Sequence, residues 1–153
     1  GRDANPKRTI EILFFGVEEL GFWGSTSFVK KHEKEVEEEY KTLINLDGFS
    51  SGLCPKNFLE TTPRARDFAK SIASDLEWEI DYEGEPMPLS DHIPFEEKNV
   101  PIIWIHEGLI DPYYHTEKDT FDHIDFDKLV KITRVASRCA FELASIEELE
   151  FGE

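Results

Sequence analysis

Short apolar runs alternate along the chain with longer stretches that mix apolar and charged residues. Residues 9–15 and 100–106 are apolar at nearly every position and rich in β-branched and aromatic side chains, a composition typical of strands covered on both faces. We therefore expect both to be central strands of a sheet. Two further strands are expected at residues 41–46 and 78–82, because each run is followed by a Gly-containing loop.

Helices are expected between and after the strands, at residues 25–39, 63–74, 91–98 and from Phe126 onward. The last has the clearest pattern, because Asp125 can cap it and its apolar residues recur at the i, i+3, i+4, i+7 spacing of one buried stripe. Strands that alternate with helices predict an α/β layered fold. Since no repeat or shift in composition marks a boundary, the prediction is a single domain over residues 1–153.

Charge excludes several classes of partner. The 153 residues include 17 Lys and Arg against 33 Asp and Glu, which gives a formal net charge of −16. A chain this acidic repels nucleic-acid phosphates and anionic lipids, so we expect no nucleic-acid or membrane partner. No apolar run reaches the roughly 18–20 residues of a membrane span, and residues 1–8 lack the apolar stretch of a signal peptide; neither observation assigns a compartment. Cys54 and Cys139 indicate neither a disulfide framework nor a metal site.

Residues able to bind a metal follow three of the expected strands. Glu18 and Glu19 come after the first, Asp47 after the second, and His115 lies in the loop after the strand that ends at His106. In α/β sheets, sites form outside the carboxyl ends of the strands, so these side chains can meet in one cleft. A mixed Asp, Glu and His set suits zinc, and an adjacent unbound carboxylate can act as general base. The pattern indicates metal-assisted hydrolysis.

Each of these residues can also be explained as a surface or turn residue without a chemical role. Pairs of Glu recur at residues 38–39, 96–97 and 147–148, and charge runs usually face solvent. Asp47 precedes Gly48, a combination typical of turns, and a single His such as His115 is more often a surface residue than a ligand. Both readings stay open on the pattern alone.

Four segments taken in order resemble the motifs of the M28 zinc peptidases, the aminopeptidase family that also includes glutaminyl cyclases. The segments are FFGVEELG at residues 14–21, NLD at 45–47, SDHIPF at 90–95 and YYHTEKDT at 113–120. The resemblance extends over nearly the whole chain. It implies a three-layer α/β/α fold around a central mixed, mostly parallel sheet, and a site that holds two zinc ions.

The resemblance also assigns roles to individual residues. It implies that Glu18 is the general base and that Glu19 binds one zinc, while Asp47 and His115 bind the other. Asp91 resembles the family's acidic residue beside the site, which would steady a metal ligand by hydrogen bonding. Asp91 can also serve as the N-cap of the helix that begins there.

The chain departs from the family pattern at its start. The family's site also uses a His and a metal-bridging Asp from motifs upstream of the strand at residues 9–15, and this chain contains neither motif. By resemblance, residues 1–153 are the C-terminal portion of the domain and lack its N-terminal strands, including one expected inside the sheet. Unpaired sheet edges invite association, so we expect a homo-oligomer or a complementing N-terminal fragment as a partner.

Three hypotheses about function follow. The first is a zinc aminopeptidase that removes N-terminal residues from peptides, in which a metal-bound hydroxide attacks the peptide carbonyl and Glu18 shuttles the proton. The second is a glutaminyl cyclase, which resembles the peptidases but uses one zinc for intramolecular aminoacyl transfer. In the third, the isolated chain is a catalytically inert fragment or binding module, because two of the family's metal ligands are absent.

Overall fold

The structure is a computed structural model in which residues 6–108 and 111–149 are described. At its centre lies a four-stranded sheet with the order β1-β4-β2-β3. The strands are β1 (Leu43–Leu46), β2 (Phe58–Thr61), β3 (Tyr82–Gly84) and β4 (Ile102–His106). β1 pairs with β4 and β2 with β3 in parallel, whereas β2 runs antiparallel to β4. The expected mixed, mostly parallel sheet is thus confirmed.

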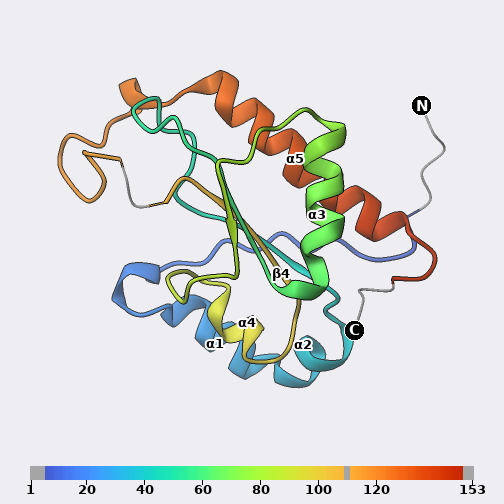
Figure 1. The fold of residues 1–153 in the computed structure, drawn as a ribbon. Coiled ribbons are helices and arrows are strands. Elements are labelled where there is room, and N and C mark those ends of the chain that lie inside the picture. Colours follow the sequence, from blue (N-terminus) through green and yellow to red (C-terminus); the bar gives the residue numbers. More distant parts are fainter. Residues whose placement is uncertain (1–5, 109–110, 150–153) are drawn as a thin grey trace.

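Helices cover both faces of the sheet (Figure 1). α3 (Pro63–Asp75) and α5 (Phe126–Ser145) lie on one face, and α1 (Trp23–Lys31), α2 (Glu33–Glu39) and α4 (Ile93–Glu96) lie on the other. Two single turns of 3-10 helix, η1 (Glu18–Leu20) and η2 (Phe121–His123), stand in the loops. The three-layer α/β/α arrangement predicted from the sequence is confirmed.

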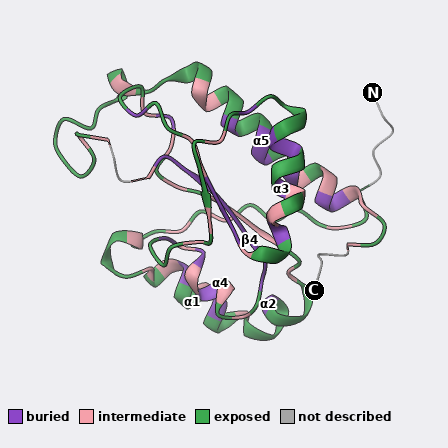
Figure 2. Ribbon diagram, in the orientation of Figure 1, coloured by how far each residue is buried: buried purple, intermediate pink, exposed green. Residues whose placement is uncertain are grey.

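Strand β4 separates two hydrophobic cores. All five of its residues are buried, and its side chains alternate between the two faces of the sheet. Ile103 and Ile105 pack with α3 and α5, whereas Ile102 and Trp104 pack with Phe95 of α4 and with the helices beside it. Figure 2 shows the buried residues concentrated on β4 and on the inward faces of the helices. Both faces of β4 are apolar because helices cover both.

The last helix forms as predicted. The Asp125 carboxylate accepts a hydrogen bond from the backbone N–H of Lys128 at 2.9 Å, which caps the first turn of α5. Ile132, Val135 and Cys139 lie on its buried stripe, as the spacing predicts. No helix among the described residues is long and apolar enough to cross a membrane.

The expectation of a central strand at residues 9–15 is wrong. This segment has no strand assignment, and its backbone makes no hydrogen bond to the backbone of another described residue. Leu13 and Phe15 pack against the second core, but Ile12 and Phe14 are 75% and 93% exposed. The apolar pattern predicts a strand covered on both faces, whereas the described residues cover only one face of this segment.

Smaller differences concern the bounds of other elements. β2 was not predicted, and β3 begins at Tyr82, at the end of the predicted strand. The first helix begins at Trp23 with Phe22 as N-cap, so Ser25 is inside it, and the helix breaks at His32. His92 rather than Asp91 occupies the N-cap position of α4, without a side-chain capping bond, and the carboxylate of Asp91 binds Ser25 instead. The prediction of Asp91 as an N-cap is therefore wrong.

Candidate functional site

The Glu18–Glu19 pair is held in a tight loop between the extended segment at residues 9–15 and α1. The carbonyl of Glu18 accepts hydrogen bonds from the backbone N–H groups of Gly21 and Phe22, at 3.0 and 2.9 Å. Val17, immediately before η1, has a φ of 63°, a left-handed conformation that is unusual for a β-branched residue. Strained backbone of this kind is more common at functional sites than elsewhere.

His115 reaches this loop from the stretch of chain that follows β4. Its Nε2 lies 2.7 Å from Oε1 of Glu19, with both side chains about half exposed. Its ring stacks on Tyr114, with ring centroids 3.8 Å apart. His115 itself has a φ of 60°, so the loop turns sharply at the residue that carries the imidazole. The structure thus brings Glu19 and His115 into direct contact.

Asp47 stands at the carboxyl end of β1 and is fixed by a chain of hydrogen bonds. The hydroxyl of Ser90 donates to Oδ2 of Asp47 at 2.6 Å, and the same hydroxyl accepts from Nδ2 of Asn45 at 2.8 Å. That amide also lies 3.3 Å from Nδ1 of His92, whose Nε2 is 3.0 Å from the carbonyl of Met87. Ser90 and His92 are buried, so the carboxylate rests on a buried polar support.

Asp91 is anchored by the first helix. The buried hydroxyl of Ser25 in α1 donates to Oδ1 of Asp91 at 2.6 Å. Burial raises the pKa of Asp91, Ser25 opposes that rise, and Asp47 adds to it. Asp91 therefore lies close enough to Asp47 to feel its charge, and its own carboxylate is bonded to Ser25.

Electrostatics link Glu18 to all the other candidates. Burial raises the pKa of the Glu18 carboxyl, and the charges of Asp47, Glu19 and Asp91 raise it further, while His115 lowers it. The side chains from the four segments singled out in the sequence therefore meet in one region. Their roles as base and metal ligands stay predictions.

Tyr114 belongs to the same region and was missed by the sequence reasoning. Burial raises the pKa of its phenol, and the charges of Glu19, Asp47 and Glu18 raise it further. The available signal was its position next to His115 in the long loop after β4. An aromatic hydroxyl among these carboxylates can donate a hydrogen bond to a substrate or a ligand.

The donor types at this site suit zinc, but their number is small. Carboxylates and a neutral imidazole are common zinc ligands, and the contact between Glu19 and His115 places one of each side by side. Among the residues described, however, no group of three His, Cys, Asp or Glu side chains could hold a metal ion. A catalytic zinc usually has three protein ligands. The described residues therefore provide part of a zinc site.

A small cavity adjoins the cluster. It has a volume of about 160 Å³, and its walls include Gly48 and Tyr114, the chain neighbours of Asp47 and His115. Glu107 also lines it and is held in place by the ammonium of Lys128 at 2.7 Å. A side chain bound at the cluster could extend into this space.

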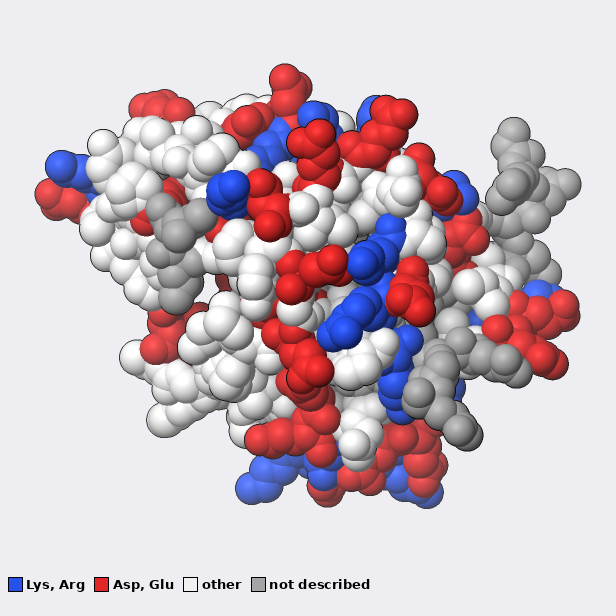
Figure 3. Space-filling model, viewed as in Figure 1, with Lys and Arg blue, Asp and Glu red and all other residues white. Residues whose placement is uncertain are grey.

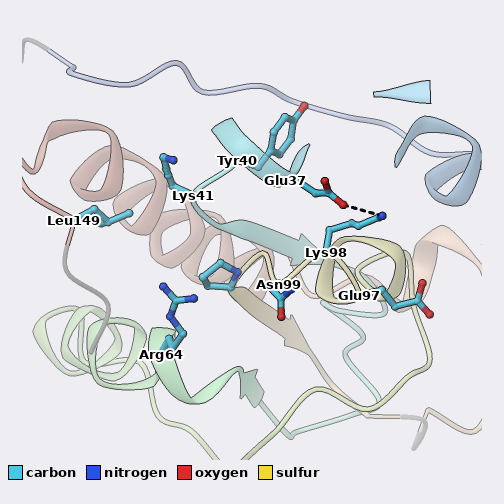
Figure 4. A pocket seen from close by; sticks show the side chains of 9 residues that line it. Glu37, Tyr40, Lys41, Arg64, Glu97, Lys98, Asn99 and Leu149 are labelled. Carbon is cyan, nitrogen blue, oxygen red and sulfur yellow. Dashed lines mark hydrogen bonds and ion pairs between the residues drawn. The ribbon is translucent and has the colours of Figure 1, made fainter. Parts of the chain in front are cut away.

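A larger cavity, of about 530 Å³, contains none of the candidate residues (Figure 4). It lies at the opposite end of the sheet, because Lys41 and Pro101 on its wall precede β1 and β4, whereas Asp47 follows β1. Its lining mixes charges, with Arg64 and a 2.9 Å ion pair between Lys98 and Glu37. Basic side chains lie between acidic ones on the face in Figure 3 as well. Size alone does not identify the site here.

Curated relatives match nearly all of this chain. Aminopeptidase YwaD of Bacillus subtilis (strain 168) is 23% identical over 151 residues, covering 92% of the chain and 33% of its own length. Probable leucine aminopeptidase 1 of Trichophyton verrucosum (strain HKI 0517) is 26% identical over 163 residues, covering 94% of the chain and 41% of its own length. The chain thus spans about a third to two fifths of these relatives.

Solved structures share the fold. The zinc aminopeptidase BSAP from Bacillus subtilis superposes with a TM-score of 0.78 at 22% identity, over 95% of this chain and 38% of its own. An aminopeptidase from Aneurinibacillus sp. strain AM-1 superposes with a TM-score of 0.76 at 26% identity, over 91% of this chain and 34% of its own. A glutaminyl cyclase from an Acidobacteriales bacterium superposes with a TM-score of 0.65 at 20% identity, over 81% of this chain and 46% of its own.

A family model agrees with both sets of relatives. The model described as peptidase family M28 matches residues 2–140, which include all the candidate site residues. The chain belongs to peptidase family M28.

Proposed function

We propose that this chain is the C-terminal portion of a zinc-dependent aminopeptidase domain, which hydrolyses N-terminal residues from peptides. One observation carries the proposal: Glu19 and His115, from loops far apart in sequence, meet at 2.7 Å beside Glu18, Asp47 and Asp91. The names of the relatives support the activity, since they are aminopeptidases of one family.

In this proposal each side chain has a separate task. Glu18 takes a proton from the attacking water and delivers it to the leaving amine. Glu19, Asp47 and His115 hold zinc, which when bound would act as a Lewis acid at the scissile carbonyl. Asp91, anchored by Ser25, adds negative charge beside Asp47. The acidic cluster also suits the terminal ammonium of a peptide, which favours an exopeptidase.

The proposal is tested by hydrolysis of leucine p-nitroanilide in the presence of zinc, using the complete polypeptide that contains this chain. We expect Glu18→Gln to lower kcat by at least about 100-fold, because a general base contributes that much or more, while bound zinc is unchanged. Glu38→Gln, on the exposed side of α2, is the matched control and should leave kcat unchanged. Retained activity in Glu18→Gln would remove Glu18 from the mechanism.

A glutaminyl cyclase is the second candidate. The SDHIPF segment at residues 90–95 fits that group, and a glutaminyl cyclase is among the structures that share the fold. Cyclisation of a peptide with N-terminal Gln separates the two activities. Release of p-nitroaniline without cyclisation would support the peptidase, and cyclisation without release would support the cyclase.

A further inference from the structure

Glu60 of β2 is a fully buried carboxyl group on an inner strand of the sheet. Burial raises the pKa of this carboxyl, and a hydrogen bond from the backbone of Met87 partly offsets the rise. Among the described residues its one ion-pair contact is with His106 of β4, whose Nε2 lies 3.4 Å from Oε1 of Glu60. Burying an acidic side chain costs free energy unless hydrogen bonds compensate for it, so the donors around Glu60 define its role.

The imidazole of His106 turns its N–H toward this carboxyl group. The backbone N–H of Gly108 donates to Nδ1 of His106 at 3.0 Å, so in the neutral ring the proton is on Nε2, the atom nearest Glu60. Burial, followed by the charge of His92, lowers the pKa of His106 to about 4, which keeps the ring neutral at pH 7. Neither Oε1 of Glu60 nor Nε2 of His106 has a hydrogen-bond partner elsewhere among the described residues. The two atoms therefore depend on each other.

The other oxygen of Glu60 holds the segment at residues 87–92, which leads into α4. Oε2 accepts a hydrogen bond from the backbone N–H of Met87 at 2.8 Å. The carbonyl of Met87 lies 3.0 Å from Nε2 of the buried His92. Both backbone groups of Met87 thus contact buried side chains, although its own side chain is partly exposed.

Asn45 holds the same segment on the other side of Trp104. Asn45, Trp104 and Glu60 are register partners on the adjacent strands β1, β4 and β2, so their side chains project to one face of the sheet. The Asn45 amide donates to the hydroxyl of Ser90 at 2.8 Å, and the ring of His92 lies 4.8 Å from that of Trp104. The segment is therefore tied to the sheet on both sides of β4.

We propose that Glu60 is a positioning residue for the metal ligand Asp47, an inference that rests on the function proposed above. Through the amide of Met87, Glu60 fixes the segment from which the Ser90 hydroxyl donates to Oδ2 of Asp47 at 2.6 Å. Asp91 follows Ser90 directly in the chain, so both carboxylates depend on the placement of this segment.

A carboxylate is suited to this task because it offers only acceptors. Met87 and His106 both present N–H groups to Glu60, and an amide at this position would place an NH₂ group against one of them. Glu60 and His106 are already buried by the described residues, so the arrangement does not require further chain to cover it.

The test is titration of Zn²⁺, and separately of Co²⁺, into the complete polypeptide that contains this chain. Glu60→Gln should lower zinc affinity about 3- to 10-fold, less than the loss typical of a residue that touches a ligand directly, because Glu60 acts through Ser90. The visible absorption of bound Co²⁺ should change as well, because a displaced Asp47 alters the coordination geometry. Glu83→Gln makes the same chemical change at a half-exposed position in the neighbouring β3 and should leave both readouts unchanged.

Met87→Pro tests the same hydrogen bond without altering Glu60, and serves if Glu60→Gln folds poorly. Proline lacks the N–H that Glu60 accepts, and position 87 is 37% exposed and precedes Pro88, where extended backbone is favoured. We expect the same fall in zinc affinity and the same change in the Co²⁺ spectrum.

Asp47→Asn, measured in parallel, separates failure of this inference from failure of the proposed function. If Asp47→Asn weakens zinc binding while Glu60→Gln and Met87→Pro leave it unchanged, Glu60 does not position the ligand and the proposed function stands. A fall in affinity with an unaltered Co²⁺ spectrum would likewise reduce Glu60 to a structural role and overturn the inference. If Asp47→Asn itself binds zinc as wild type does, Asp47 is no ligand, and the proposed metal set fails together with the inference.

Discussion

The imidazole Nε2 of His115 lies 2.7 Å from Oε1 of Glu19, although 96 residues separate them in the chain. Glu19 lies in η1 and His115 in the loop after β4, and both side chains are more than half exposed. A contact between exposed groups this far apart in sequence contributes little to stability by itself. Its meaning is geometric, because it places a nitrogen and a carboxylate donor where one metal ion could bind both. This pairing differs from the one inferred from the family resemblance, which assigns Glu19 and His115 to different zinc ions.

The hydroxyl of Ser90 should matter for metal affinity. It is buried and donates to Asp47 while accepting from Asn45, so Ser90→Ala leaves the Asp47 carboxylate without its support. We expect zinc affinity to fall about 10- to 100-fold, the usual effect of losing a residue that orients a ligand. Ser74→Ala, on the exposed side of α3, serves as control in the same titration. Equal affinity in both variants would show that Asp47 needs no support from Ser90.

Stability should fall between pH 7 and pH 5, partly through His92. Burial lowers the pKa of this imidazole from its ordinary 6.5 to about 4, so the folded protein keeps it neutral while the unfolded chain protonates it. Because the unfolded state binds more protons in this range, stability is lost as the pH falls below 6.5. A shift of this size corresponds to about 2 kcal/mol at pH 5.

Urea unfolding of wild type and His92→Gln at the two pH values measures this contribution. Other buried groups also titrate, so the comparison uses the difference between the proteins at each pH. We expect the loss of unfolding free energy between pH 7 and pH 5 to be smaller in the variant by about 2 kcal/mol. An identical loss in both proteins would mean that His92 becomes protonated in the fold at its ordinary pKa.

Lys128 should be a main stabilising contact of the loops around the small cavity. Its ammonium lies 2.7 Å from the buried carboxylate of Glu107 and also donates to the carbonyls of Cys54 and Lys56, at 2.7 and 3.0 Å. Lys128→Met leaves Glu107 buried without its counter-charge and should cost about 3–5 kcal/mol of unfolding free energy. Lys131→Met, exposed on the same helix, is the control. A loss below about 1 kcal/mol would place this pair among weak surface contacts.

Local patterns predicted the parts of the fold that depend on local interactions. The cap at Asp125 and the apolar stripe of α5 need only neighbours along the chain, and both were correct. The approach of Asp47 to Tyr114 follows from a general property of α/β sheets, because the loops after the parallel strands β1 and β4 share one edge. Glu18 reaches the same edge although the segment before it forms no strand. Few further assumptions were needed.

Non-local pairing is where the sequence was insufficient. The apolar pattern of residues 9–15 predicted a central strand, but pairing depends on which strand lies beside it, and no such strand is present among the described residues. β2 was missed because it is short and its Glu60 is fully buried, which a polarity pattern does not suggest. Ser90 and Tyr114 became recognisable only once their distant neighbours were placed.

Zinc binding by the complete polypeptide that contains this chain, measured by isothermal titration, tests the central claim most directly. The account predicts that Zn²⁺ binds and that His115→Ala and Glu19→Gln each weaken binding at least about tenfold, since each removes a ligand. His32→Ala is the matched control, because His32 also pairs with a carboxylate, at 3.1 Å from Glu35, and stands at the junction of α1 and α2, outside the candidate set. Absence of binding, or equal affinity in all four proteins, would contradict the assignment of Glu19 and His115 as zinc ligands.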